Sequence, residues 1–250
     1  NFLLIAGVLA SMLANAQEYK VSKTSGRLEI RDLNRVTIEG HAGNEIVFTR
    51  EDNNRERDER AAGLRAVSAL GLEDNTGLGL SLAEKDGGIE VRQLKKMDGP
   101  RITIKVPKGI VVSYSHNSPY GSDVMFSNLE NAIEASTVHS DLMLTNVTGP
   151  LTVKTVHGNI DVRLGQHVKS AITITSVHGH VDVSMPVATK ASMKMSTSWG
   201  ELFVDPDFKM QIDQNCNMVK YSDKINGTIN GGGIEMALSS THDNVYLRKN

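Results

Sequence analysis

The sequence predicts an all-β fold, a right-handed β-solenoid-like stack of short strands with coils of about 20 residues, plus one inserted helix near residues 54–70. The first observation behind this prediction is a unit that recurs at nearly constant spacing between residues 136 and 204. The second is that each unit contains short apolar-x-apolar triplets, the period of a strand with one buried face. The third is composition: 39% of the residues are hydrophobic but only 4% are aromatic, which suits thin stacked layers.

Each repeated unit is centred on one residue, which we call the pivot. The pivots are His139, His157, His178 and Trp199, so successive steps are 18, 21 and 21 residues. Glycine follows the last three pivots, at Gly158, Gly179 and Gly200. Because glycine adopts positive φ without steric cost, we expect it to let the chain turn a corner after the pivot. Units this short bury their apolar side chains only by stacking on neighbouring copies.

Two architectures fit the repeated unit. In a solenoid each unit is one coil, and His157 stacks over His178. In a meander His-Gly is a hairpin turn, which places Lys154 opposite Asp161. Matching residue types at matching positions favour the solenoid, and hairpins prefer Asn-Gly or Asp-Gly at their turns. The residues then expected to point inward are Ile160, Val162, Ile172, Ile174, Val181 and Val183.

Residues 1–16 predict a signal peptide that is incomplete at its N-terminus, because neither a starting Met nor a basic region precedes the apolar run. That run ends in Ala14-Asn15-Ala16, which places small residues where signal peptidase requires them. We therefore expect cleavage before Gln17 and an exported, soluble protein of the periplasm, the outer cell surface or the extracellular space. No later stretch is long enough to span a membrane.

Residues 17–115 are expected to form an N-terminal β region with a helical insertion. Short β signals lie at residues 28–30, 36–38, 46–48, 78–82, 89–91, 102–106 and 111–112. The helix is expected because Leu64, Val67 and Leu70 lie three apart on one helix face, and Gly71 would end it. Residues 116–250 predict the β-repeat region, continuous with the preceding part, with further pivots at Tyr221 and His242.

Composition excludes several classes of function. A net charge of −2 without a basic stripe argues against nucleic acid as a partner. The single cysteine, Cys216, excludes an internal disulfide and a multi-cysteine zinc site. The glycines at 77 and 79 lack the Lys-Ser/Thr and the following helix of a phosphate loop. We therefore predict no cofactor and no metal site.

The repeats resemble those of the putative-adhesin domain family, bacterial envelope proteins rich in short β repeats. The residues that carry the resemblance are Val106-Pro107-Lys108-Gly109, Ser136-Thr137-Val138-His139, Val147-Thr148-Gly149-Pro150-Leu151 and the Thr-Val-His-Gly and Ser-Val-His-Gly units. It extends over Lys20–Lys249 and is strongest over Ile102–Val204. In the family the pivot is commonly Asn before Gly, whereas here it is His, Trp or Tyr. The resemblance implies a solenoid-like fold and an envelope location, and it supplies no catalytic residues.

The candidate ligand-binding residues come from the repeats. His139, His157 and His178 are expected at one corner, where stacked imidazoles either pack ring on ring or ligate a metal. Packing is favoured, since no carboxylate sits at the same position in every unit. Asp161 and Asp182 occupy equivalent outward positions, and Lys154 also points outward, beside threonines.

These residues support two functions. The favoured one is a non-enzymatic, exported β-repeat protein, an adhesin-like surface or periplasmic module that binds a glycan or another cell-envelope protein. The alternative is a carbohydrate-active enzyme, a polysaccharide lyase or hydrolase on a β-helix, with Asp161 and Asp182 as its carboxylates. The alternative is weaker because Met143 and Phe203 hold the same position in the flanking units, and no Gly-x-Ser-x-Gly elbow exists.

Overall fold

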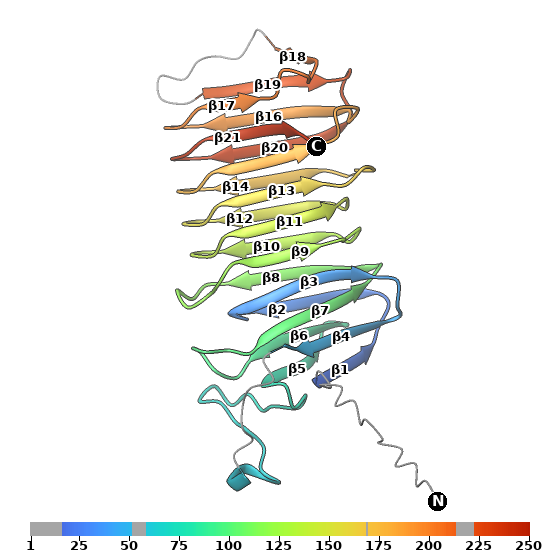
Figure 1. The fold of residues 1–250 in the computed structure, drawn as a ribbon, viewed down its shortest axis with the longest axis vertical. Helices are drawn as coiled ribbons and strands as arrows, with labels where there is room; N and C mark the ends of the chain where they lie inside the picture. The colour runs from blue at the N-terminus through green and yellow to red at the C-terminus, as the bar shows by residue number, and fades with distance from the viewer. Residues whose placement is uncertain (1–16, 52–58, 169, 214–222) are drawn as a thin grey trace, which may run out of the picture.

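The computed structural model describes residues 17–51, 59–168, 170–213 and 223–250. Within these ranges the strands form two sheets, which both extend along the length of a tall stack (Figure 1). Sheet A has ten strands in the order β1 (Gln17–Ser22), β4 (Glu45–Arg50), β7 (Arg101–Pro107), β3 (Arg35–His41), β9 (Val124–Ser127), β11 (Leu142–Val147), β13 (Ile160–Leu164), β15 (Val181–Met185), β21 (Val245–Lys249) and β17 (Leu202–Val204). Sheet B has eleven strands in the order β18 (Met210–Ile212), β19 (Asp223–Ile229), β16 (Ala191–Thr197), β20 (Ile234–Ser240), β14 (Ile172–Ser176), β12 (Leu151–Thr155), β10 (Ile133–Thr137), β8 (Ile110–His116), β2 (Gly26–Arg31), β6 (Gly88–Gln93) and β5 (Leu80–Lys85).

In the repeats, successive strands alternate between the two sheets and pair in parallel with strands of neighbouring units. Thus β12 pairs in parallel with β10 and β14, and β13 pairs in parallel with β11 and β15. The solenoid-like arrangement is therefore correct and the meander is wrong. Lys154 lies between Ser136 and Thr175 in sheet B, and not opposite Asp161. The right-handed sense of the coil stays a prediction.

The coils do not stack in sequence order at either end. A coil here is one strand of sheet B with the next strand of sheet A. The last coil, β20–β21, lies between β14–β15 and β16–β17. At the other end the first coil, β2–β3, lies between β6–β7 and β8–β9. Antiparallel strands complete both ends of the stack: β1, β4 and β5 at one, β18 and β19 at the other.

One hydrophobic core runs through the stack from Leu28 to Leu247 and includes residues from both sides of the predicted division at residue 115. All six residues expected to point inward are buried, with at most 3% of their surface exposed. Along sheet B, Val153, Ile174 and Leu238 occupy the same register position on neighbouring strands. Equivalent positions therefore form continuous aliphatic columns, as the period-two triplets predict.

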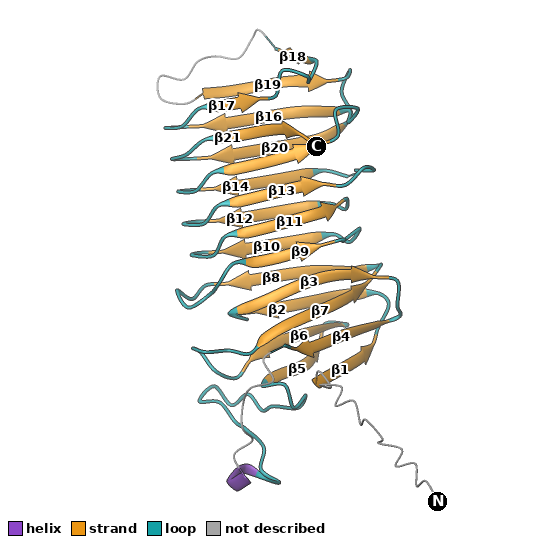
Figure 2. Ribbon diagram, in the orientation of Figure 1, coloured by secondary structure: helices purple, strands orange, loops and turns teal. Residues whose placement is uncertain are grey.

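The predicted helix is wrong for the part of it that the structure describes. Only Glu59–Ala61 form a helix, a single 3₁₀ turn, and turns and bends follow (Figure 2). Leu64, Val67 and Leu70 are 75%, 63% and 80% exposed, so no surface receives the predicted apolar face. An isolated helix of this length is marginal without such packing, and Gly63 interrupts it at φ 78°.

Three other expectations fall on residues outside the described ranges: the signal peptide at 1–16, the start of the predicted helix at 54–58 and the pivot Tyr221. None of the helices within the described ranges has both the length and the apolar character needed to cross a bilayer.

Candidate functional site

The pivots form an exposed row of stacked rings along one corner of the solenoid. The ring centroids of His139 and His157 are 5.1 Å apart, and those of His157 and His178 are 4.7 Å apart, with interplanar angles of 8° and 2°. The next ring is His242, 4.7 Å from His178, and Trp199 follows at 6.4 Å. The three predicted histidines are therefore brought together. The coil inserted at the C-terminal end places His242 where sequence order would put Trp199.

Buried hydroxyl groups two residues before each pivot hold this corner in shape. They belong to Thr137, Thr155, Ser176, Thr197 and Ser240. In the third unit Ser176 Oγ accepts a hydrogen bond from the Gly179 N–H at 3.0 Å and donates one to the Gly158 carbonyl of the neighbouring coil at 3.0 Å. The units of Thr197 and Ser240 repeat both bonds. Each hydroxyl thus closes its own turn and ties it to the adjacent coil.

Glycine follows the pivot for a different reason from the one predicted. Neither Gly158, Gly179 nor Gly200 has positive φ. Instead, a Cβ atom on Gly179 would lie 2.0 Å from the carbonyl oxygen of Gly158, and one on Gly200 would lie 2.2 Å from that of Asp243. The stacked corners approach so closely that a side chain would collide with the backbone of the neighbouring coil. Packing between coils therefore explains glycine at these three positions, whereas Ser140 and Asp243 follow the pivots His139 and His242.

The histidine row is built from mutually repelling groups once they are charged. Partial desolvation and, as a smaller effect, repulsion from His157 and His242 hold the pKa of the exposed His178 below its usual value. Each nitrogen lone pair lies in the plane of its imidazole ring, and the stacked ring planes are nearly parallel. Neighbouring imidazoles therefore cannot direct their lone pairs at one metal ion. In the described ranges no three His, Cys, Asp or Glu side chains are arranged to hold a metal.

A second row of polar side chains, two residues after the pivot, connects the corner to sheet A. Asp141 Oδ1 accepts the Asn159 backbone N–H at 2.7 Å, and Asn159 Oδ1 accepts the His180 backbone N–H at 3.1 Å. Further along the stack, Asn244 Oδ1 accepts the Glu201 N–H at 2.8 Å. This row fixes the backbone just before β13, β15 and β17, including the backbone of His180.

The outer face of sheet A beside this corner carries a connected group of aromatic and charged side chains, which we call the sheet A patch. Its members are Asp161, His180, Asp182, Phe203, Tyr246 and Arg248. Five of them lie on the neighbouring strands β13, β15, β21 and β17, and His180 immediately precedes β15. Because side chains on one face of a sheet alternate with buried ones, the same alternation that buries the core presents these residues to solvent.

Tyr246 is the centre of the sheet A patch. Its ring stacks on Phe203 with centroids 5.1 Å apart and planes 11° apart, and the Arg248 guanidinium lies 4.9 Å from its centroid. His180 contacts the ring edge-on at 6.2 Å. The Tyr246 hydroxyl accepts a hydrogen bond of 2.9 Å from the Asn244 side chain. These contacts hold the ring in one orientation although the side chain is only partly buried.

The two aspartates of the patch are each held by a different basic side chain. The Arg248 Nε atom lies 2.9 and 2.7 Å from the Asp182 carboxylate oxygens, and this pairing raises the pKa of the guanidinium. Asp161 Oδ1 lies 3.2 Å from His180 Nε2. The aspartates are register partners on β13 and β15, so they lie side by side on one face.

The predicted residues therefore belong to two neighbouring features and one distant position. The histidines form the corner row, Asp161 and Asp182 lie in the sheet A patch, and Lys154 lies on the outer face of sheet B. Sequence reasoning missed His180, Phe203, Tyr246 and Arg248 as site residues. The sequence did carry a signal for two of them. Phe203 and Tyr246 each occupy the central position of an apolar-x-apolar triplet, the position that Asp182 occupies in its own triplet.

Comparisons with known proteins identify a matching family and solved structures with partial similarity. The model of the family described as Toastrack DUF4097 matches residues 14–248, which confirms the family resemblance seen in the sequence. The crystal structure of a "putative cell adhesion protein" from Clostridium sporogenes is 11% identical, with 94% of this chain and 100% of that chain covered and a TM-score of 0.48. That of a "putative adhesin" from Bacteroides fragilis is 9% identical, with 94% and 97% covered and a TM-score of 0.35. No curated protein matches the sequence.

Proposed function

The chain belongs to the Toastrack DUF4097 family, and we propose that it is an exported, adhesin-like module that binds a glycan or another cell-envelope protein through the sheet A patch. The observation that carries this proposal is the exposed aromatic group on an otherwise regular sheet face. Phe203 is 42% exposed, and it stacks on the partly buried Tyr246. Aromatic side chains held rigidly beside paired charges are typical of surfaces that recognise a partner.

The arrangement of the patch favours binding over catalysis. A glycosidase needs two carboxyl groups on either side of the scissile bond, one of them free to give a proton. Asp161 and Asp182 instead lie side by side on a flat face, and each is paired with a basic side chain. In a binding surface the same pairs orient hydrogen-bonding groups and restrict the partner to one register.

The proposal includes export. The apolar segment that ends in Ala14-Asn15-Ala16 supports it, because secreted precursors carry such a segment and such a cleavage site. Export would place the repeat region where envelope glycans and envelope proteins are available as partners.

The test is a binding screen of the purified chain against a glycan array and against cell-envelope proteins, with Tyr246→Ala and Phe203→Ala as site variants. Loss of either aromatic contact should weaken a genuine interaction about tenfold or more, the effect of removing a central interface residue. Lys154→Ala is the matched control, because Lys154 is exposed on the other sheet. If every interaction found in the screen survives both aromatic substitutions, the proposal is contradicted. Turnover of a glycan would favour the enzyme alternative.

A further inference from the structure

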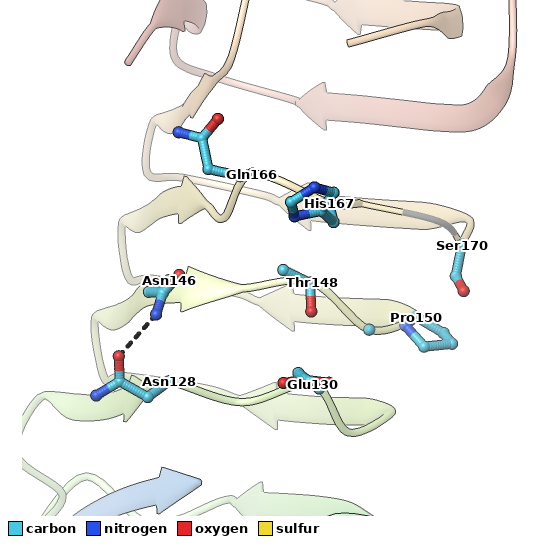
Figure 3. A pocket seen from close by; sticks show the side chains of 9 residues that line it. Asn128, Glu130, Asn146, Thr148, Pro150, Gln166, His167 and Ser170 are labelled. Carbon is cyan, nitrogen blue, oxygen red and sulfur yellow. Dashed lines mark hydrogen bonds between the residues drawn. The ribbon is translucent and has the colours of Figure 1, made fainter.

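The corner opposite the pivots contains a pocket formed by turns of unequal length. The turn before β10 spans residues 128–132, the turn before β12 spans 148–150, and the connection before β14 includes the described residues 165–168 and 170–171. The 18-residue step between pivots contains the shortest of these turns, and the following 21-residue step contains the longest. Side chains from the two longer turns flank the short one, and together they line a cavity of about 570 Å³ (Figure 3).

The floor of this pocket is fixed by packing between coils. A Cβ atom on Gly149 would lie 2.1 Å from the Asn131 carbonyl oxygen, so the short turn sits directly against the turn below it. The Thr148 N–H donates to the Leu129 carbonyl at 3.0 Å. Asn131 is itself buried, and its side chain donates to the carbonyls of Pro107 and Ile110 at 2.9 and 2.8 Å. The floor therefore exists before any ligand binds.

One wall is a pair of asparagines in matching conformations. Asn128 and Asn146 both have positive φ, 55° and 53°, a conformation that asparagine tolerates better than most residues. The Asn146 Nδ2 atom donates to Asn128 Oδ1 at 2.8 Å, which Figure 3 shows as a dashed line. This bond orients both carboxamides across neighbouring coils.

The residues that line the pocket are mostly polar and uncharged, and this composition indicates the chemical class of ligand that the pocket fits. Carboxamides come from Asn128, Asn146 and Gln166, and hydroxyl groups from Thr148 and Ser170. Carboxamides both donate and accept hydrogen bonds, as do hydroxyls, so they complement a ligand that carries many hydroxyl groups. The one lining carboxylate, of Glu130, is 2.7 Å from the Lys108 ammonium, and the Pro150 ring supplies an apolar surface.

We propose that this pocket is a second binding site and that it takes a neutral sugar, one or two pyranose rings of a glycan. Its volume lies within the roughly 300–1,000 Å³ typical of small-ligand sites. A phosphorylated ligand would need clustered cations and a lipid would need apolar walls, and the described lining residues provide neither. The site lies at the corner opposite the pivots and shares no residue with the sheet A patch. The proposal of a sugar site here is therefore independent of the proposal that the sheet A patch binds a partner.

The experiment titrates the ¹⁵N-labelled chain with glucose, galactose, mannose, N-acetylglucosamine and cellobiose up to about 50 mM. Side-chain amide signals of Asn128, Asn146 and Gln166 report directly on the pocket. We expect at least one sugar to shift them with a Kd of about 0.1–10 mM, as suits a small ligand. Absence of any such shift over the whole panel would overturn the proposal.

Variants then separate this pocket from other surfaces. The double variant Gln166→Ala/His167→Ala removes two exposed wall side chains and should weaken binding about tenfold. Thr148→Phe should block the pocket, whereas Tyr246→Ala, in the sheet A patch, should leave the sugar affinity unchanged. If Thr148→Phe fails to fold, the Gln166 and His167 substitutions still decide the question. An affinity that survives them, or one that Tyr246→Ala abolishes, would assign sugar binding elsewhere.

Discussion

Truncation of Ile174 is the most direct test of the stacked core. Ile174 has 0% of its surface exposed and lies between Val153 and Leu238 at the same register position of the neighbouring strands. Because those strands are hydrogen-bonded on both sides, we expect little collapse around a shortened side chain. Ile174→Ala should therefore leave a cavity within the column.

The expected loss follows from the atoms removed. Isoleucine to alanine deletes three carbon atoms, which at about 0.8 kcal/mol each removes about 2.4 kcal/mol of transfer free energy. If a cavity of about 50 Å³ remains, it adds about 1.2 kcal/mol at roughly 24 cal/mol per Å³. The free energy of unfolding should thus fall by about 3.6 kcal/mol, within the usual range of about 2–5 kcal/mol for such changes.

Urea unfolding followed by circular dichroism measures this loss, provided that the transition remains single and its m-value is unchanged. Ile174→Val should cost only about 0.5–1.5 kcal/mol. Thr173→Ala is the matched control, because Thr173 is exposed on the same strand and should change stability by less than about 0.5 kcal/mol. A loss below about 0.5 kcal/mol for Ile174→Ala would refute the assignment of the inward face.

Three further predictions concern the pivot corner and export. Gly179→Ala should destabilise the protein by at least about 1–3 kcal/mol, since its Cβ would overlap the neighbouring backbone; a neutral result by urea unfolding would contradict the close packing. The lowered pKa of His178 means that the unfolded chain binds more protons just below about pH 6.5, so stability should fall from there until the folded-state pKa is passed. The double variant His157→Asn/His178→Asn should lose less stability than the wild type between about pH 8 and pH 5, and equal losses would show that the row is uncoupled. Sequencing of the exported form should begin at Gln17, and an intact apolar segment there would refute cleavage.

The features that could be predicted from sequence are those set by short-range patterns. Alternation within triplets identified the inward residues, such as Ile160 and Val181, because strand geometry sends neighbouring side chains to opposite faces. The repeat spacing identified the stacked histidines, because parallel in-register coils place equivalent residues above one another. Both inferences need only the local geometry of a strand and the assumption that equivalent residues of neighbouring coils stack on one another.

What could not be predicted depends on contacts between distant segments. The spacing of Leu64, Val67 and Leu70 predicts a helix, yet a helix forms only where its apolar face has a surface to cover. Glycine after the pivot was correctly singled out, but its reason, the carbonyl oxygen of the next coil, appears only once coils are stacked. The hydroxyl of Ser176 likewise bonds to a residue 18 positions away.

The order of the coils links the fold to the proposed sheet A patch. Tyr246 and Arg248 belong to the inserted strand β21, whereas Asp182 lies on β15 and Phe203 on β17, at either side of it. If the coils stacked in sequence order, Phe203 would neighbour Asp182, and neither the Tyr246–Phe203 stack nor the Arg248–Asp182 pair would exist. The insertion therefore creates the patch. It also makes the patch sensitive to whether the C-terminal coil stays between its neighbours, because that coil supplies the central ring.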